Sequence, residues 1–384
     1  MMLVAPARLA VAWVTMFLVG TELFVFSPLL PLLAADYHIS TALAGLSVTI
    51  FSLAYMFGAP ILGQLCDRFG RRRVLLCSLI GFTTANWLTA SAGNLLSLLI
   101  IRLLAGVAAA GISPSIYALV SSAAAPERRA TWLAIVVSGL LVALALGAST
   151  GGFIGAWLGW HSVFTALGGL SLLFGWLNLL VWPPDCGAAA NVEAARPYPI
   201  MKVGLARRLL PMVIWSTGLY GVYTYLGAGL IAVGFSTAQT AQAILLYGCG
   251  SIAGVLIGGR LADRLGVRFT AGASFAGLCA CLLVLREALN TGKLVEPALG
   301  VSSAVAQLFF PAQQAGLAND FPGERGMVMA WNNSALFFGI SLGSVLGGQA
   351  IALGFDANLT IAAGLALVGC IVNAIVVPGR ATPA

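Results

Sequence analysis

Charged side chains are scarce in this sequence, since Asp, Glu, Lys and Arg together make up only 8% of its 384 residues. A typical soluble domain carries about 25%, so an ordinary water-soluble globular fold is excluded. Histidine occurs only twice, and no His, Cys, Asp and Glu residues share the spacing of a metal site or an acid–base cluster. A phosphate-binding Walker loop is missing as well. These absences argue against a membrane enzyme and against any process driven by ATP hydrolysis in this chain.

Apolar residues take the place of charge: they form 60% of the sequence, and the mean hydropathy is +0.99. A helix of about 20 apolar residues crosses the roughly 30 Å core of a bilayer, and such runs follow one another from end to end. We therefore predict an all-α integral membrane protein. Its twelve expected transmembrane helices cover residues 9–34, 41–66, 74–92, 95–120, 131–157, 160–182, 209–234, 238–262, 268–286, 297–318, 326–352 and 357–378.

The longest polar stretch, at residues 183–208, divides these helices into two sets of six. It contains four prolines and four Lys or Arg residues, which a membrane-spanning helix would not tolerate together. We expect an N-terminal six-helix bundle at residues 1–182, a cytoplasmic linker at 183–208 and a C-terminal six-helix bundle at 209–384.

The distribution of Lys and Arg predicts the orientation, because short loops rich in these residues stay on the cytoplasmic side. Nearly all of the 19 lie at the ends of the chain or in alternate loops, and only Arg286 and Lys293 fall in the opposite loops. Both termini are therefore expected in the cytoplasm. The net charge of +7 reflects this topology and attraction to anionic lipid, and we expect no nucleic-acid partner.

Charge concentrates in one loop of the first half, which reads GQLCDRFGRRR at residues 63–73. Part of this motif returns 196 positions later, in the segment GGRLADRLG at residues 258–266. The matching residues are Gly63, Asp67, Arg68 and Gly70 in the first copy and Gly259, Asp263, Arg264 and Gly266 in the second. A parallel internal repeat is typical of transporters built from two related bundles.

The pattern G-x-L-x-D-R-x-G-R-R, with twelve spans and a central linker, resembles the major facilitator superfamily over the whole chain. The resemblance implies two six-helix bundles with pseudo-twofold symmetry. It also implies a cavity lined by helices one, four, seven and ten, which opens to each side of the membrane in turn. Within the family, the chain is most similar to the drug:proton antiporter branch, which serves bacterial small-molecule efflux.

The charged loop is expected to act as a conformational latch. Glycine allows a tight turn, and a carboxylate at a helix end accepts charge-assisted hydrogen bonds. The resemblance brings Asp67 to the start of helix eleven, where Arg325 is the expected partner. The alternative is that the arginines only keep the loop in the cytoplasm. The expected latch residues are Gly63, Asp67, Arg68, Gly70, Arg71, Arg72, Asp263, Arg264 and Arg325.

Two charges fall well inside expected helices, Glu22 in the first and Arg102 in the fourth. An ionisable residue at membrane depth is costly and indicates function. Burial favours a neutral carboxyl group, and a nearby guanidinium favours a charged one. A substrate or a conformational change can therefore shift the protonation equilibrium of Glu22. We expect this pair, which resembles charges of the antiporter branch, to couple transport to protons. The alternative is a buried ion bridge that only holds the first bundle together.

Glycines recur at helical intervals in the expected fifth helix, at Gly139, Gly147, Gly151 and Gly152. They resemble the glycine motif of the antiporter branch, although Ala148 stands where that branch has proline. The alternative interpretation is a smooth surface on which another helix packs closely.

Polar and aromatic residues in the cavity helices are candidates for substrate contact, although each could equally make a hydrogen bond between helices. Three tyrosines beside glycines in the expected seventh helix form the densest cluster. The full set is Tyr55, Tyr117, Tyr220, Tyr223, Tyr225, Gln307, Gln313, Asn332 and Asn333.

These features together predict a secondary active transporter, with proton-coupled efflux of a drug, sugar or nucleoside type of molecule by alternating access. A proton-coupled importer or a facilitator of a small metabolite would use the same parts, and a polytopic membrane enzyme is the further alternative. We expect no cofactor, with the proton gradient as energy source. The expected partners are the substrate, protons and membrane lipid. The expected setting is a monomer in the bacterial inner membrane with a role in multidrug resistance.

Overall fold

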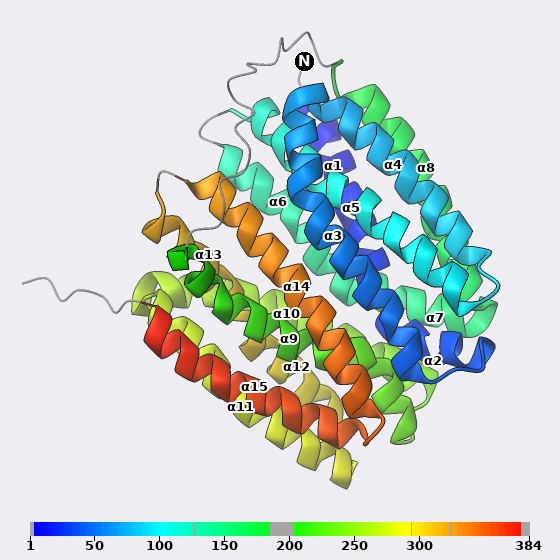
Figure 1. Cartoon of the computed structure of the whole chain (residues 1–384), viewed down its shortest axis with the longest axis vertical. Helices are drawn as coiled ribbons and strands as arrows, with labels where there is room; N and C mark the ends of the chain where they lie inside the picture. Colours follow the sequence, from blue (N-terminus) through cyan, green and yellow to red (C-terminus); the bar gives the residue numbers. More distant parts are fainter. Residues whose placement is uncertain (1–3, 126–127, 185–202, 293, 323, 378–384) are drawn as a thin grey trace, which may run out of the picture. The chain divides into compact units, whose positions relative to one another are not determined.

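The computed structural model describes residues 4–125, 128–184, 203–292, 294–322 and 324–377, and no strand forms within these ranges (Figure 1). The side chains of Asp67 and Arg325 lie outside the described part, as does most of the expected linker. The chain divides into two compact units, which we call unit 1 and unit 2. Unit 1 comprises Met1–Ile39 and Leu46–Pro199, and unit 2 comprises Ser40–Gly45 and Ile200–Ala384.

Unit 1 contains the first six expected helices, two of them interrupted. They are α1 (Val4–Phe24) followed by α2 (Phe26–Asp36), α3 (Thr41–Phe69), α4 (Arg71–Ala90), α5 (Leu95–Ala123), α6 (Arg129–Val142) followed by the π-helical turn η2 (Ala143–Gly147) and α7 (Ala148–Leu158), and α8 (Trp160–Val181). The first turn of α3 belongs to unit 2.

Unit 2 contains the other six expected helices, one of them interrupted. They are α9 (Val203–Ala232), α10 (Thr237–Leu265), α11 (Val267–Thr291), α12 (Val295–Gln307) followed by α13 (Phe309–Asp320), α14 (Arg325–Ile351) and α15 (Phe355–Val376). Across the described ranges of both units, nine helical stretches are long and apolar enough to cross a membrane, one of them running through α6, η2 and α7.

Two of the interrupted helices end four residues before a proline. Pro28 has no N–H to donate to the carbonyl of Phe24, and its ring crowds that carbonyl, so α1 ends there. Pro311 stands in the same relation to Gln307, the last residue of α12. Pro60 lies inside the unbroken helix α3, so a proline permits such a break without enforcing it.

Glycine forms the sharp turn in both copies of the loop motif. Gly70 joins α3 to α4 with a φ angle of 99°, and Gly266 joins α10 to α11 with a φ angle of 92°. Residues that have a Cβ atom rarely adopt such positive φ angles. The repeat of these glycines in the sequence therefore has a direct structural reason.

The glycines of the fifth expected helix pack directly on the first. A Cβ atom added at Gly139 would lie 2.6 Å from the carbonyl oxygen of Trp13, and one at Gly152 would lie 2.9 Å from Cβ of Pro28. Gly147 and Gly151 are in the same position, since their added Cβ atoms would collide with Thr21 and Val25 respectively. Only glycine allows α6, η2 and α7 to approach α1 and α2 this closely.

In unit 2, glycines likewise allow α14 to pack closely on α9. Added Cβ atoms would lie 2.7 Å from the carbonyl oxygen of Val213 at Gly339 and 2.5 Å from that of Thr217 at Gly343. In each unit, a glycine-lined helix thus packs closely on the helix that begins that half of the chain.

Candidate functional site

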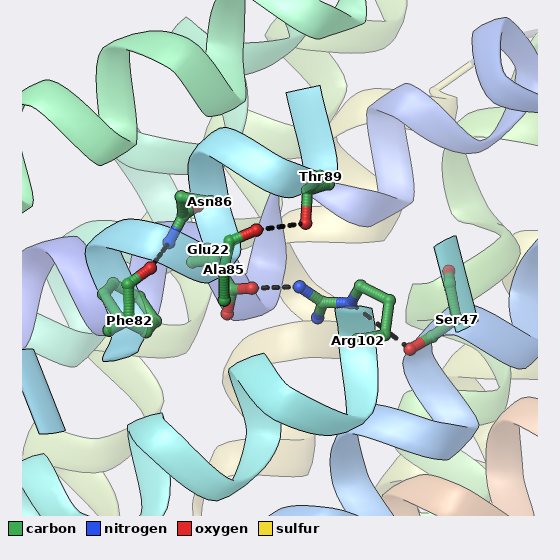
Figure 2. A network of polar contacts seen from close by, with 7 residues as sticks. All are labelled: Glu22, Ser47, Phe82, Ala85, Asn86, Thr89 and Arg102. Atoms are coloured by element: carbon green, nitrogen blue, oxygen red, sulfur yellow. Dashed lines mark hydrogen bonds and ion pairs between the residues drawn. The ribbon is translucent and has the colours of Figure 1, made fainter. Parts of the chain in front are cut away.

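The two intramembrane charges predicted from the sequence lie together in unit 1. Glu22 comes from α1, Arg102 comes from α5, and Nη1 of Arg102 donates to Oε1 of Glu22 (Figure 2). Each side chain is only 1% exposed. Because an isolated charge is very costly to bury, the two opposite charges stabilise one another here.

Aromatic rings flank the guanidinium of Arg102. Its Cζ atom lies 4.2 Å from the ring centroid of Phe26 in α2 and 4.4 Å from that of Phe51 in α3. The Nε atom of Arg102 also donates to the carbonyl oxygen of Ser47, at 3.4 Å. Cation–π contacts are worth about 2 kcal/mol or more each when they are desolvated. Arg102 is therefore held by three groups besides Glu22.

Glu22 is held much less completely than its partner. Its second oxygen, Oε2, is buried and has no hydrogen-bond partner among the described residues. A buried carboxylate oxygen without a donor is unfavourable. Of the two side chains, Glu22 therefore has the less complete set of polar contacts.

Further buried polar side chains of α4 are drawn with the ion pair in Figure 2. Asn86 donates to the carbonyl oxygen of Phe82 at 2.9 Å, and Thr89 donates to that of Ala85 at 2.8 Å. Oδ1 of Asn86 is buried without a donor in the described part of the chain. Asn86, Ser47 and the two aromatic residues could not be singled out from the sequence, because asparagine, serine and phenylalanine are common inside membrane helices.

The arginines of the loop motif contact helix carbonyls within unit 1. Arg71 donates to the carbonyl oxygen of Ala118 at 3.2 Å, and Arg72 donates to that of Leu179 at 2.6 Å. The last carbonyls of a helix lack intrahelical donors and carry partial negative charge, so the contact of Arg72 stabilises the end of α8, whereas Arg71 binds a carbonyl within α5.

The remaining latch residues are placed as follows. Arg68 lies over the ring of Phe69, with Cζ 5.3 Å from its centroid. Gly63 lies within α3, and Asp263 and Arg264 are exposed in the last turn of α10. The expected contact between Asp67 and Arg325 falls outside the described side chains.

Unit 2 contains an ion pair that the sequence did not predict. Nε of Arg208 donates to Oδ2 of Asp320 at 2.7 Å, and Nη2 contacts the same oxygen. The side chains are 9% and 30% exposed. We expected Arg208 in the linker, but α9 begins at Val203 and includes it. The segment VGLARRLL contains good helix formers, and this composition could have predicted the earlier start of α9.

The tyrosines of α9 separate into two environments. Tyr223 lies 6.3 Å from Tyr220 and 5.3 Å from Tyr247 between ring centroids, so these three form an aromatic cluster. The hydroxyl of Tyr225 instead donates to the carbonyl oxygen of Ser344 in α14, at 2.8 Å. Tyr225 therefore contributes to helix packing within unit 2.

The other candidates for substrate contact are distributed over both units. Tyr55 is buried beside Phe51, and Tyr117 is half-buried in α5. Gln313 donates to the carbonyl oxygen of Arg208 at 2.9 Å and is thus occupied in packing. The remaining three candidates lie within helices of unit 2: Gln307 and Asn332 are buried, and Asn333 is half-buried.

Comparison with known proteins identifies the family. The family model described as Major Facilitator Superfamily matches residues 12–292 and 220–384. The chain belongs to this superfamily. It is 30% identical over 343 residues to the MFS-type transporter YceJ of Bacillus subtilis (strain 168), covering 87% of this chain and 86% of that protein. It is 28% identical over 270 residues to a chloramphenicol resistance protein of Streptomyces lividans, covering 67% of each chain.

Solved structures of the superfamily share the fold. The crystal structure of a D-xylose-proton symporter superposes with a TM-score of 0.81 at 17% identity, covering 97% of this chain and 98% of that chain. The superfamily membership confirms the predicted fold class and the prediction of a multi-pass membrane transporter rather than an enzyme. A drug-resistance protein among the relatives agrees with the predicted branch.

Proposed function

We propose that this transporter exports a small organic molecule in exchange for protons, with Glu22 as the proton-binding group. The observation that carries the proposal is the buried pair of Glu22 and Arg102, in which Oε2 of Glu22 has no partner within the described part. A charge pair that served stability alone would be expected to satisfy all of its polar atoms, because each unmet one adds a penalty.

The contacts around Arg102 support a simple coupling step. When a proton binds Glu22, the carboxylate charge disappears and its attraction to Arg102 weakens. Arg102 keeps its contacts with Phe26, Phe51 and the carbonyl of Ser47. The cation stays in place while α1 is released from α5, and loss of the proton restores the pair. Alternating access then requires that the two states of Glu22 favour different conformations of the transporter.

The position of Glu22 in the chain supports movement of α1. It lies three residues before Val25, where the helix is interrupted ahead of Pro28. Interruptions of this kind absorb changes of backbone direction. A change at Glu22 can thus alter the angle between α1 and α2 without disturbing the hydrogen bonds of either helix.

Export is favoured over import by one of the relatives. The Streptomyces protein confers chloramphenicol resistance according to its name, and a transporter does so by moving the compound out of the cell. The aromatic cluster of Tyr220, Tyr223 and Tyr247 in unit 2 is suited to stacking on a flat organic substrate. The distribution of Lys and Arg supports an orientation in the cytoplasmic membrane with both termini and the linker inside.

The direction and the coupling are tested together in inverted membrane vesicles with an acidic interior. Chloramphenicol, cationic dyes, sugars and nucleosides are added in turn, and substrate uptake and proton release are measured. Export by antiport predicts substrate uptake with proton release for at least one compound. Movement of substrate and protons in the same direction would indicate an importer, and uptake that ignores the gradient would indicate a facilitator.

The role of Glu22 is tested in the same vesicles with Glu22→Gln, which keeps the shape of the side chain but cannot titrate. Gradient-driven uptake should fail, while substrate exchange without a gradient should continue. Glu287→Gln is the matched control, because Glu287 is exposed at the end of α11 and should behave as the parent. Unchanged proton dependence in Glu22→Gln would exclude Glu22 as the coupling acid.

A further inference from the structure

Unit 2 contains a pocket that the proposed transport mechanism does not use. Its volume is about 740 Å³, which is within the size range of small-molecule sites. The lining comes from the start of α11, from the ends of α10, α13 and α15, and from Arg208 near the start of α9. All of these lie at the end of unit 2 that carries the second copy of the loop motif.

The start of α11 gives this pocket a positive partial charge. Gly266, Val267, Arg268 and Phe269 all line it, and the first backbone bond of the helix runs from the N–H of Thr270 to the carbonyl of Gly266. Gly266 has no side chain with which to cap the preceding N–H groups. A helix start of this kind favours an anion.

Arg208 provides a second, independent indication of an anionic ligand. It lines the pocket and is only 7% exposed, and its Nη1 atom has no acceptor among the described residues. Its Nε and Nη2 atoms are directed to Asp320. Arg268 adds another positive charge and binds the carbonyl of Ala374 through Nη2, at 2.6 Å. The two arginines outnumber the one aspartate in the lining.

Apolar side chains extend from the same pocket to the surface. Leu265 is 51% exposed and Phe269 is 59% exposed, and both belong to the lining. A ligand with a phosphate group alone would leave this apolar surface uncovered. A ligand with a phosphate and a hydrocarbon chain would use both parts, and the inner leaflet of a bacterial membrane supplies such molecules next to Arg-rich loops.

The matching end of unit 1 is filled by the protein itself. Trp182 follows α8 there and is 2% exposed, its Nε1 atom donates to Oδ1 of Asn178 at 2.9 Å, and Arg8 lies 5.7 Å from its ring centroid. In unit 2, Val377 follows α15 and lines the open pocket instead. Trp182 of unit 1 and Val377 of unit 2 thus differ in size at corresponding positions, directly after the last helix of each unit.

We propose that this pocket binds an anionic phospholipid. Its phosphate is bound by the start of α11 and by Arg208, and one acyl chain lies along Leu265 and Phe269. A free phosphate ion shares the head-group chemistry but lacks the chain, so the experiment separates the two sources.

The test measures lipid binding to the purified full-length transporter by native mass spectrometry. Phosphatidylglycerol is titrated against phosphatidylcholine with the same acyl chains. Phosphatidylglycerol should bind about tenfold more tightly, because its phosphate gives it a net negative charge, whereas the ammonium group of phosphatidylcholine cancels that charge. Inorganic phosphate is then added in excess. Little displacement supports the lipid, whereas full displacement would assign the site to a free anion and overturn the lipid proposal.

Two variants link this preference to the pocket. The double variant of Arg208→Gln with Asp320→Asn removes both charges while keeping hydrogen-bonding groups, so no buried charge is left alone. Ala273→Phe places a large side chain on a lining residue and should fill the space, as Trp182 does in unit 1. Both should reduce the preference for phosphatidylglycerol to less than about twofold.

Arg260→Gln is the matched control, because Arg260 is an exposed arginine near the end of α10 that does not line the pocket. It should retain the tenfold preference. Equal binding of the two lipids by the parent would overturn the proposal, as would an unchanged preference in both pocket variants or its loss in Arg260→Gln. None of these readouts depends on transport, so failure here and failure of the proton-coupled export are distinguishable.

Discussion

An ion pair joins two helices in each unit, and the pairs differ in how far they are removed from water. Glu22 and Arg102 of unit 1 are each 1% exposed, whereas Arg208 and Asp320 of unit 2 are 9% and 30% exposed. A buried pair adds little net stability, but the loss of one partner is severe. A pair that water can reach tolerates such a loss better. One proton therefore has far larger consequences in unit 1.

The largest effect is expected from Arg102→Met, which leaves Glu22 buried without its partner. Folding should be destabilised by about 3–5 kcal/mol, as measured by equilibrium unfolding of the purified protein in mixed detergent micelles at neutral pH. The double variant of Arg102→Met with Glu22→Leu should recover most of this stability, because no unpaired charge remains. It should nevertheless lack proton-driven transport. A double variant as unstable as the single one would contradict the charge explanation.

Close packing should cost the same in both units, unlike the loss of charge. Gly139→Ala in unit 1 and Gly343→Ala in unit 2 each place a Cβ atom against a backbone oxygen, at 2.6 and 2.5 Å respectively. Each should destabilise by about 1–3 kcal/mol in the same unfolding measurement. Gly169→Ala is the control, since nothing lies within 4 Å of its added Cβ atom. A much larger cost in one unit would show that the two helix contacts are not equivalent.

Neutralising the pair of unit 2 should have a smaller effect. Asp320→Asn keeps a hydrogen-bond acceptor for Arg208, and the site is partly open to water. We expect a loss of about 1–2 kcal/mol in stability, because Arg208 loses the opposite charge but keeps an acceptor, and unchanged proton dependence in the vesicle assay. If Asp320→Asn abolished the response to the proton gradient as Glu22→Gln should, the contrast between the units would fail.

The smallest effect is expected at Tyr37, just after α2, and it tests whether another group of unit 1 could mimic Glu22. Burial, with a contribution from Asp36, raises the pKa of Tyr37 from 10.0 to about 12. The neutral phenol is favoured in the folded state, so its contribution is present below pH 10 and is lost as pH rises toward 12.

Tyr37→Phe removes the hydrogen bond to the carbonyl of Ala92 and should cost about 0.5–1.5 kcal/mol. This cost should be constant between about pH 5 and pH 9, because Tyr37 does not titrate there. Thermal unfolding across this range measures it. A cost that varied with pH in this window would mean that the outer end of unit 1 contributes to its proton response.

The sequence predicted those features that follow from composition and spacing. Long apolar runs predicted the helices, and two isolated charges in such runs predicted Glu22 and Arg102, because charge in a membrane helix is costly enough to be conspicuous. The glycines of the loop motif predicted turns that Gly70 and Gly266 form with positive φ angles. In each case, a single strong physical effect determines the local structure.

What the sequence could not predict depends on contacts between distant residues. Phe26 and Phe51 flank Arg102, but phenylalanine in a membrane helix is too common to be informative. The pairing of Arg208 with Asp320 was missed because Arg208 was assigned to the linker and Asp320 falls just after the expected helix at 297–318, where charges are ordinary. The pocket of unit 2 is lined by residues from five helices, and no pattern within a single helix indicates that space.

The arginines that bind helix ends also carry information about the history of the chain. Arg72 donates to Leu179 and Arg268 donates to Ala374, each at 2.6 Å, and the two arginines are separated by the same 196 positions as the rest of the loop motif. A contact present in both halves is most simply inherited from a single ancestral half. It was then in place before the halves diverged, and so before Glu22 and Arg102 distinguished one from the other.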